Sequence, residues 1–202
     1  MTEGCFVDLL VAHVESMLDP TLIEPVGPVY RHMGALIVDS SLQAGLRYET
    51  VVAPRVRRVL ETWPLASETS RFLDCCLRWG LMEVLNWTHP EKLERVLRIT
   101  MLLHHRRVET VDELGGWALT SHGRNDLLAL RGVGPKTVDY MAGLAGRPTI
   151  AVDRHLFRFA ADAGLPALTY DNLAAAFYAA AEALELDPGG LDRAVWAHMA
   201  DA

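Results

Sequence analysis

The stretch LLALRGVGPKTVDYMAGLAGRPTIAVDRHLFR, residues 127–158, indicates more about the fold than any other part of this sequence. It predicts a helix, a tight glycine turn and a second helix. Gly132 and Gly134 flank Val133, so the turn can adopt backbone conformations closed to other residues while the valine packs into the core. Pro135 suits the first turn of the second helix. The N–H groups at such a turn converge on a site for a phosphate oxygen, although a turn that only packs two helices explains the glycines as well.

The rest of the chain also carries helix signals, and no segment has the sustained alternation of a β-strand. Thr88 and Glu91 predict a capping box, with Pro90 in the first turn of the helix that follows. The fold is therefore expected to be all-α. Besides the helix after Thr88, helices are expected at about 3–18, 29–43, 53–62, 68–78, 111–119, 124–130, 135–145, 153–164, 170–186 and 190–200.

The composition is that of a protein with a substantial core, because half of the 202 residues are apolar. No apolar run approaches the roughly 20 residues that a membrane-spanning helix needs, and the N-terminal segment lacks the early positive charge of a signal peptide. A cytoplasmic protein without membrane contact is therefore expected. The three cysteines, Cys5, Cys75 and Cys76, are expected to be reduced and packed, because neighbouring cysteines on a helix point in different directions.

The charge is distributed unevenly along the chain. Residues 1–30 carry a net charge of −5 and residues 161–202 a net charge of −6, which leaves +4 for the middle of a chain whose total is −7. The negative total argues against a protein that coats nucleic acid by bulk attraction. A basic middle fits a module that faces DNA, and scattered solvated charges fit the same numbers.

Two motifs follow each other in the stretch 127–158. The pattern L-x-G-V-G-x-K-T is followed by a glycine/proline loop that ends in an aspartate, and Lys136 lies 17 positions before Asp153. The residues that carry the two motifs are Leu130, Gly132, Val133, Gly134, Lys136, Thr137, Gly146, Pro148, Val152, Asp153, Arg154 and His155. Together they resemble the helix-hairpin-helix/Gly-Pro-Asp superfamily of DNA glycosylases, of the endonuclease III-like kind.

The resemblance implies that Lys136 and Asp153 are catalytic residues. Breaking an N-glycosidic bond leaves positive charge on the sugar, which a fixed carboxylate such as that of Asp153 stabilises. A neutral lysine amine can bond to the same carbon, displace the base and form a Schiff base that permits elimination of the 3′ phosphate. The expected activity is that of a DNA glycosylase with AP-lyase activity.

The presence of lysine rather than arginine at position 136 supports a role as a nucleophile. Only Lys92 and Lys136 are lysines among the 19 basic residues, so this chain uses arginine almost everywhere else. Arginine would serve for a phosphate contact, but its guanidinium stays protonated and is a poor nucleophile. Lys92, between Glu91 and Glu94, is expected to be a surface helix charge.

The same resemblance suggests residues that contact DNA. The segment from Ala35 to Leu60 is similar to the family's helix-turn-helix, where Gln43 takes the position of a side chain that fills the gap left by a flipped base. An ordinary exposed glutamine is the alternative. DNA-binding residues are expected at Gly132, Val133, Gly134, Arg131, Arg158 and Gln43.

Two further residues are candidates for the base pocket. Tyr140 either lines this pocket or fills the core, and Asp139 either orients its neighbourhood or is a solvated helix carboxylate. His155, two residues after Asp153 at the start of a helix, either contacts a backbone phosphate or packs around the site, and a structural role is expected.

The resemblance also implies two helical lobes with the catalytic cleft between them. Residues 30–150 would form a six-helix domain ending in the hairpin, and residues 1–29 with 151–202 a second lobe. No cysteine follows Asp153, so no 4Fe–4S cluster is expected, although a monovalent cation at the hairpin is allowed. The expected partner is double-stranded DNA with a damaged, mismatched or modified base, bound by a monomer.

Two other functions fit the same residues. A monofunctional glycosylase would use Asp153 and water without cutting the strand. A non-catalytic helix-hairpin-helix module would use Lys136 as a phosphate contact. The identity of the excised base is not encoded in any one motif, because the pocket is assembled from several helices.

Overall fold

The computed structural model describes residues 3–43 and 45–201, and within these ranges the chain is helical, with no β-strand. This confirms the prediction of an all-α fold. The α-helices are α1 (Glu3–Met17), α2 (Met33–Leu42), α3 (Ala53–Thr62), α4 (Thr69–Cys75), α5 (Leu81–Leu85), α6 (Pro90–His105), α7 (Val111–Ala118), α8 (Ser121–Leu128), α9 (Pro135–Leu144), α10 (Arg154–Asp162), α11 (Tyr170–Ala183) and α12 (Pro188–Asp201).

The chain divides into two compact units. Unit 1 comprises Met1–Gly27 and Arg147–Ala202, and unit 2 comprises Pro28–Gly146. The unit boundaries at 27/28 and 146/147 lie two and four residues before the expected boundaries at 29/30 and 150/151. Each unit has its own cluster of buried apolar side chains.

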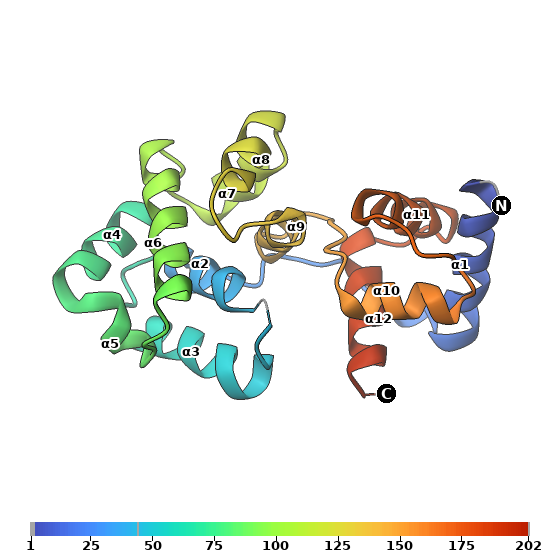
Figure 1. Ribbon diagram of the computed structural model, residues 1–202, viewed down its shortest axis with the longest axis horizontal. Helices are drawn as coiled ribbons and strands as arrows, with labels where there is room; N and C mark the ends of the chain where they lie inside the picture. The colour runs from blue at the N-terminus through green and yellow to red at the C-terminus, as the bar shows by residue number, and fades with distance from the viewer. Residues whose placement is uncertain (1–2, 44, 202) are drawn as a thin grey trace. The chain divides into compact units, whose positions relative to one another are not determined.

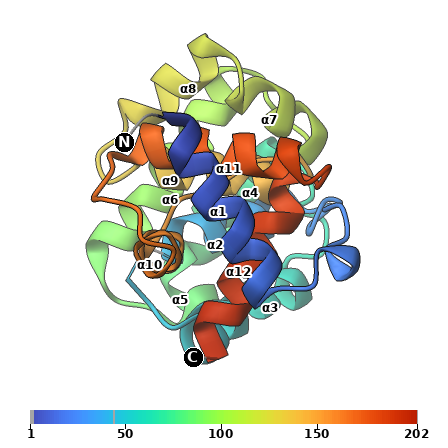
Figure 2. The same ribbon diagram turned by 90° about the vertical axis from the view of Figure 1, so that its right-hand side faces the viewer.

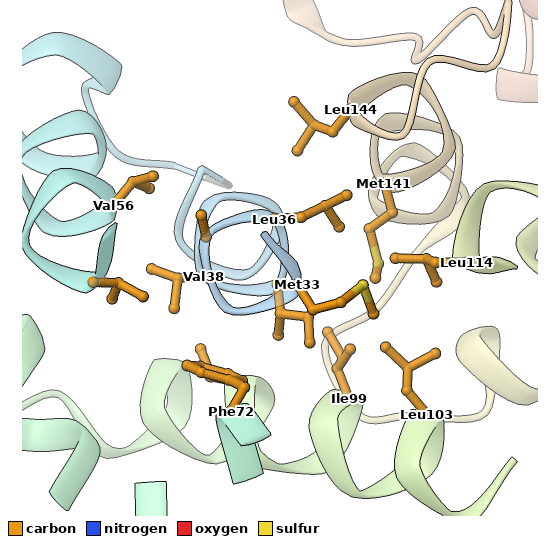
Figure 3. Packing of buried hydrophobic residues seen from close by; sticks show 14 of the residues in the cluster. Met33, Leu36, Val38, Val56, Phe72, Ile99, Leu103, Leu114, Met141 and Leu144 are labelled. Carbon is orange, nitrogen blue, oxygen red and sulfur yellow. The ribbon is translucent and has the colours of Figure 1, made fainter. Parts of the chain in front are cut away.

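Unit 2 is built around α2, whose ten residues are all buried. Helices α3, α4, α6, α7 and α9 send apolar side chains towards it, as Figure 3 shows for Val56, Phe72, Ile99, Leu114 and Met141. A helix that is apolar on all sides must be surrounded on all sides. The sequence of α2, MGALIVDSSL, therefore explains why it lies in the centre of unit 2 (Figure 1).

The helix starts follow local capping rules, with one correction to the sequence analysis. Helix α7 begins with a complete capping box, in which the Thr110 hydroxyl accepts from the Glu113 N–H and the Glu113 carboxylate accepts from the Thr110 N–H. The capping box predicted at Thr88 and Glu91 was wrong. Helix α6 begins after His89, with Pro90 in its first turn and no side-chain cap. Proline supplies the helical φ angle there and has no N–H group that needs a cap.

The region after α4 differs from the single helix predicted over 68–78. Helix α4 ends at Cys75, a π-helical turn follows at Cys76–Gly80, and α5 was not predicted at all. Gly80 has a φ of +80°, so the chain changes direction there. Cys76 is buried and Cys75 half-buried, and both are free thiols, as is Cys5.

The α-helices of unit 1 are α1, α10, α11 and α12 (Figure 2). Their buried apolar side chains form a core that includes Leu10, Phe159 and Phe177. Two hydrogen bonds fix the segment that enters α10. The Ile150 N–H donates to the Tyr178 hydroxyl at 3.1 Å, and the Ala151 N–H donates to the Asp192 carboxylate at 2.9 Å. None of the helices within the described residues is both long and apolar enough to cross a lipid bilayer.

Candidate functional site

The turn between α8 and α9 has the backbone geometry that its glycines permit. Gly132 has a φ of +82°, in the left-handed region, and the Val133 N–H donates to the Leu130 carbonyl at 3.0 Å. Val133 is buried, as predicted for the residue that plugs the turn. A side chain on Gly132 would also collide with Arg95, because a Cβ atom there would lie 2.5 Å from Nη2 of its guanidinium.

Gly134 is a different case, because nothing in its own surroundings requires glycine. It is the N-cap of α9, with an ordinary extended backbone (φ −115°, ψ 177°), and a Cβ atom built there has no neighbour within 4 Å. Serine, aspartate or asparagine would cap the helix better. The glycine leaves the backbone at the start of α9 open to close approach.

Lys136 lies one residue into α9 and is half-buried. Its Nζ donates to Oε1 of Gln43 at 3.3 Å and lies 5.7 Å from the centre of the Tyr140 ring. Unit 2 therefore brings together three residues that the sequence analysis singled out separately. Gln43 is the C-cap of α2, and its N–H group donates to the Asp39 carbonyl, which fixes it one turn beyond Asp39.

Asp39 is a buried carboxylate that the sequence analysis did not select. It lies in the middle of α2 with no exposed surface. The hydroxyl of Tyr30 donates to its Oδ2 at 2.7 Å, that of Tyr48 to the same oxygen at 3.4 Å, and that of Tyr140 to Oδ1 at 3.1 Å. We call Asp39 and these three tyrosines the Asp39 cluster. Tyr140 thus has a polar role in addition to its contacts with the core.

The electrostatics of the Asp39 cluster follow from its burial. Burial raises the pKa of the Asp39 carboxyl, while the tyrosine hydrogen bonds and the charge of Lys136 act in the opposite direction. Burial and the nearby Asp39 charge raise the pKa of Tyr140, so its hydroxyl stays protonated and can donate. The same two causes raise the pKa of Tyr30. Lys136 is therefore close to one buried acid and to aromatic hydroxyls that cannot ionise near neutral pH.

The prediction that Lys92 is a surface charge was wrong. Lys92 is half-buried on α6, and its Nζ donates to the carbonyls of Ser41 at 3.4 Å and Leu42 at 3.2 Å. Arg95 donates to the Ser41 carbonyl as well, at 3.1 Å. Two cations therefore meet the C-terminal end of α2, where the carbonyl groups have no partner within the helix.

Asp139 is buried, so the expectation of a solvated helix carboxylate was wrong. The two terminal guanidinium nitrogens of Arg124, Nη1 and Nη2, donate to the two carboxylate oxygens of Asp139, which joins α8 to α9 on either side of the glycine turn. Asp139 thereby holds the turn in shape. Arg131 is exposed, with its guanidinium 3.9 Å from the carboxylate of Glu91.

Asp153 belongs to unit 1, where it is the N-cap of α10. Its Oδ1 accepts from the N–H groups of His155 at 2.8 Å and Leu156 at 3.3 Å. The capping bonds fix the orientation of the carboxylate. Arg158 is exposed and lies 3.9 Å from Asp162, and the ring of His155 lies 6.1 Å from that of Trp196. The structure describes Lys136 within unit 2 and these residues within unit 1.

The sequence contained a signal for Asp39 that was not used. Asp39 is the one charged residue in the run from Met33 to Leu42, and it lies one helical turn before Gln43. A carboxylate in an otherwise buried helix has to be hydrogen-bonded, and such groups concentrate at functional sites. Tyr30, Tyr48 and Lys92 had no comparable signal, because their positions depend on how distant segments pack.

Taken together, the site offers an amine near an open helix start, a polar side chain beside it and a buried acid with fixed hydroxyl donors. An amine of this kind can attack an electrophilic carbon, and the N–H groups at a helix start can bind a phosphate. Within the described residues, no group of three or more His, Cys, Asp or Glu side chains is arranged to hold a metal ion.

Residues 86–200 match the model of a family described as Domain of unknown function (DUF8548). The match covers more than half of the chain, so the protein belongs to this family. The matched region includes Lys92, Lys136 and Asp153, and it begins after Asp39 and Gln43. Neither the curated proteins nor the solved structures contain a match to the chain.

Proposed function

We propose that this protein is a DNA glycosylase with AP-lyase activity, in which Lys136 is the nucleophile. The observation that carries the proposal is the placement of Lys136. A half-buried amine, in a chain with only two lysines, lies in the first turn of α9, two residues after the N-cap Gly134, and donates to Gln43. An amine that only bound phosphate would be replaceable by arginine, which this chain uses almost everywhere else.

The glycine turn supports a phosphate contact next to this amine. The N–H groups of Thr137 and Val138 donate to the Gly134 carbonyl at 2.9 and 3.2 Å, and Gly134 keeps the space before α9 open. A DNA phosphate bound there would hold the adjoining deoxyribose close to Lys136. Gln43 would fill the space of a base rotated out of the duplex. The resemblance to helix-hairpin-helix/Gly-Pro-Asp glycosylases implies the same arrangement.

The proposed reaction proceeds in two steps. The neutral amine of Lys136 forms a bond to C1′ while the bond from C1′ to the base breaks, and the base leaves with the electron pair and takes up a proton. Loss of a proton from the amine and opening of the sugar ring give a Schiff base. Removal of a proton from C2′ then expels the 3′ phosphate and cuts the strand.

We assign two supporting roles to carboxylates. Asp153, held by its capping bonds, would stabilise the positive charge that develops on the sugar. Asp39 would orient the hydroxyls of Tyr30, Tyr48 and Tyr140, which we place in the pocket for the flipped base. Because each hydroxyl proton is donated to Asp39, these oxygens would accept hydrogen bonds from the base, and their fixed positions would cost no reorganisation when it binds.

Borohydride trapping tests the proposal without knowledge of the excised base. A labelled duplex with one aldehydic abasic site is incubated with the protein and cyanoborohydride, and the covalent adduct is mapped by peptide mass spectrometry. We expect an adduct on Lys136 that disappears in Lys136→Gln and in Lys136→Arg. Both variants retain Lys92, so an adduct that persists in them would show that position 136 is not the nucleophile.

A panel of duplexes, each with one oxidised, mismatched or modified base, then tests base release. Base release with a trapped adduct supports the bifunctional enzyme. Base release that leaves Lys136 unmodified would favour a monofunctional glycosylase that relies on Asp153 and water. Duplex binding without either reaction would leave a non-catalytic DNA-binding module.

A further inference from the structure

Both lysines of this chain meet the same end of the same helix. Lys92 on α6 donates to the carbonyls of Ser41 and Leu42, and Lys136 on α9 donates to the side chain of Gln43. These three acceptors are consecutive residues at the C-terminal end of α2. The two amines therefore come from different helices to one short segment of unit 2.

Capping of α2 does not by itself explain a second cation at position 92. Arginines bind backbone carbonyls elsewhere in unit 2: Arg55 donates to Val51 at 2.6 Å and Arg58 to Val84 at 2.9 Å. Arg95 already donates to the Ser41 carbonyl at this very end of α2. Lys92 therefore adds a second positive charge to an end of α2 that already binds one cation.

Lys92 is a cation at neutral pH, and it interacts electrostatically with Lys136. Burial, together with the charges of Arg95 and Lys136, lowers the pKa of Lys92 to about 8, and Glu91 acts in the opposite direction. Backbone carbonyls at a helix end favour the protonated form of the amine that they bind. At pH 7 most Lys92 side chains therefore carry a positive charge close to Lys136.

Lys136 also interacts electrostatically with Asp39, whose negative charge has the opposite effect on the Lys136 amine to the positive charge of Lys92. A buried anion favours the protonated amine, and a nearby cation favours the neutral one. Within unit 2, the charged and titratable groups near Lys136 include Asp39 from α2, Tyr30 and Tyr48 from the segments on either side of α2, Glu91, Lys92 and Arg95 from α6, and Tyr140 and the Asp139–Arg124 pair from α9 and α8.

We propose that Lys92 is a positioning residue whose charge increases the neutral, reactive fraction of the Lys136 amine near neutral pH. The inference rests on the proposed function of Lys136 as a nucleophile. Lys92 offsets Asp39, which orients the tyrosines but at the same time favours the unreactive protonated amine. The balance between these two groups sets the pH range in which the Schiff base forms.

The first measurement is the pH dependence of adduct formation on an abasic duplex under single-turnover conditions between pH 6 and 10. Lys92→Met keeps an unbranched side chain that is one atom shorter and removes the charge, so the rate at pH 7 should fall on the order of three- to tenfold. At pH 9.5 the rates of variant and wild type should converge. Lys92→Arg should restore the wild-type profile, and Asp39→Asn should shift the profile to lower pH.

The second measurement does not depend on DNA. Because the chain has two lysines, reductive ¹³C-methylation gives two lysine signals in NMR spectra, and a variant at position 92 leaves only that of Lys136. The midpoint of the Lys136 titration should lie at higher pH in Lys92→Met than in Lys92→Arg. Equal midpoints would overturn the inference.

The outcomes separate this inference from the proposed function. If Lys92→Met lowers the rate by the same factor at every pH, Lys92 acts through structure or DNA binding and the inference fails, while Lys136 remains the nucleophile. If the wild type forms no Lys136 adduct at any pH, the proposed function fails and the role of Lys92 in it fails too. Thermal unfolding of Lys92→Met checks that the fold is retained.

Discussion

Replacing Gly132 by alanine should destabilise the protein, whereas the same replacement at Gly134 should leave its stability nearly unchanged. At Gly132 the left-handed backbone costs an alanine about 1 to 2 kcal/mol. Its Cβ atom would also push Arg95 away from the Ser41 carbonyl, and the loss of a hydrogen bond to a charged group costs about 1.5 kcal/mol or more. The expected loss of stability is about 2 to 4 kcal/mol.

At Gly134 the two effects on stability nearly cancel. Alanine is a poorer N-cap than glycine, by roughly 0.5 to 1 kcal/mol. It also restricts the unfolded chain, which stabilises the folded protein by about 0.4 to 1 kcal/mol. No neighbouring atom opposes the new methyl group. DNA affinity should nevertheless fall, because the methyl group occupies the space through which a phosphate would approach α9.

Urea unfolding and fluorescence anisotropy with an abasic-site duplex measure the two effects separately. We expect the urea midpoint of Gly132→Ala to fall by roughly 1 to 2 M and that of Gly134→Ala to change little. Gly45→Ala is a control for the backbone cost, because Gly45 has a φ of +77° and no Cβ contact. Equal stability of the Gly132 and Gly134 variants would refute the argument from backbone and contacts. Wild-type DNA affinity of Gly134→Ala would refute the assignment of this turn to phosphate binding.

Three further predictions follow from side chains with defined partners. Asp153→Asn keeps an oxygen that can cap α10, so this variant should unfold like the wild type while its base release slows severely. Asp153→Ala should slow base release and also lose about 1 kcal/mol of stability in thermal unfolding. Unaltered base release in Asp153→Asn would contradict the role of the carboxylate. Burial raises the pKa of Asp39 in the folded state, so the protonated Asp39 carboxyl contributes stability at low pH. This contribution to the free energy of unfolding is lost as the pH rises above 3.8, the ordinary pKa of the group, towards the raised pKa of the folded state. In urea titrations the stability of Asp39→Asn relative to wild type should therefore improve from pH 4 to pH 7, and a constant difference would argue against a raised pKa. Thr110→Ala should lower the free energy of unfolding in urea by about 1 kcal/mol, because the Thr110 side chain caps α7. Thr88→Ala should lower it by almost nothing, because the Thr88 side chain does not cap α6. Equal losses of stability in the two variants would contradict this assignment.

Local signals predicted most of the helices, and they failed where packing decides the outcome. Pro135 after Gly134 and the position of Asp153 marked the starts of α9 and α10 correctly. Thr88 and Glu91 satisfied the capping pattern without forming the cap, because α6 begins one residue later, after His89. The break between α4 and α5 has no turn signal other than Gly80.

The candidate site could be predicted only in part, for a similar reason. Lys136 and Gln43 were selected from motifs, and the structure adds the hydrogen bond between them. Asp139 and Lys92 were misjudged because a charged residue on a helix is usually solvated. Each of them is partly or fully buried by a helix that is adjacent in space, and no spacing rule within one helix contains that information.

Positions that violate the rules of folding are informative about function, because the cost has to be offset by a benefit elsewhere. Asp39 places a carboxylate in the middle of a fully buried helix, and Gly134 leaves a helix start without a side-chain cap. Apolar residues at position 39 and a serine at position 134 would serve the fold better. Asp39 lies in α2, whose C-cap is Gln43, and Gly134 is the N-cap of α9, whose first turn contains Lys136. A protein selected only to fold would have no reason to place both of them next to one of its two lysines.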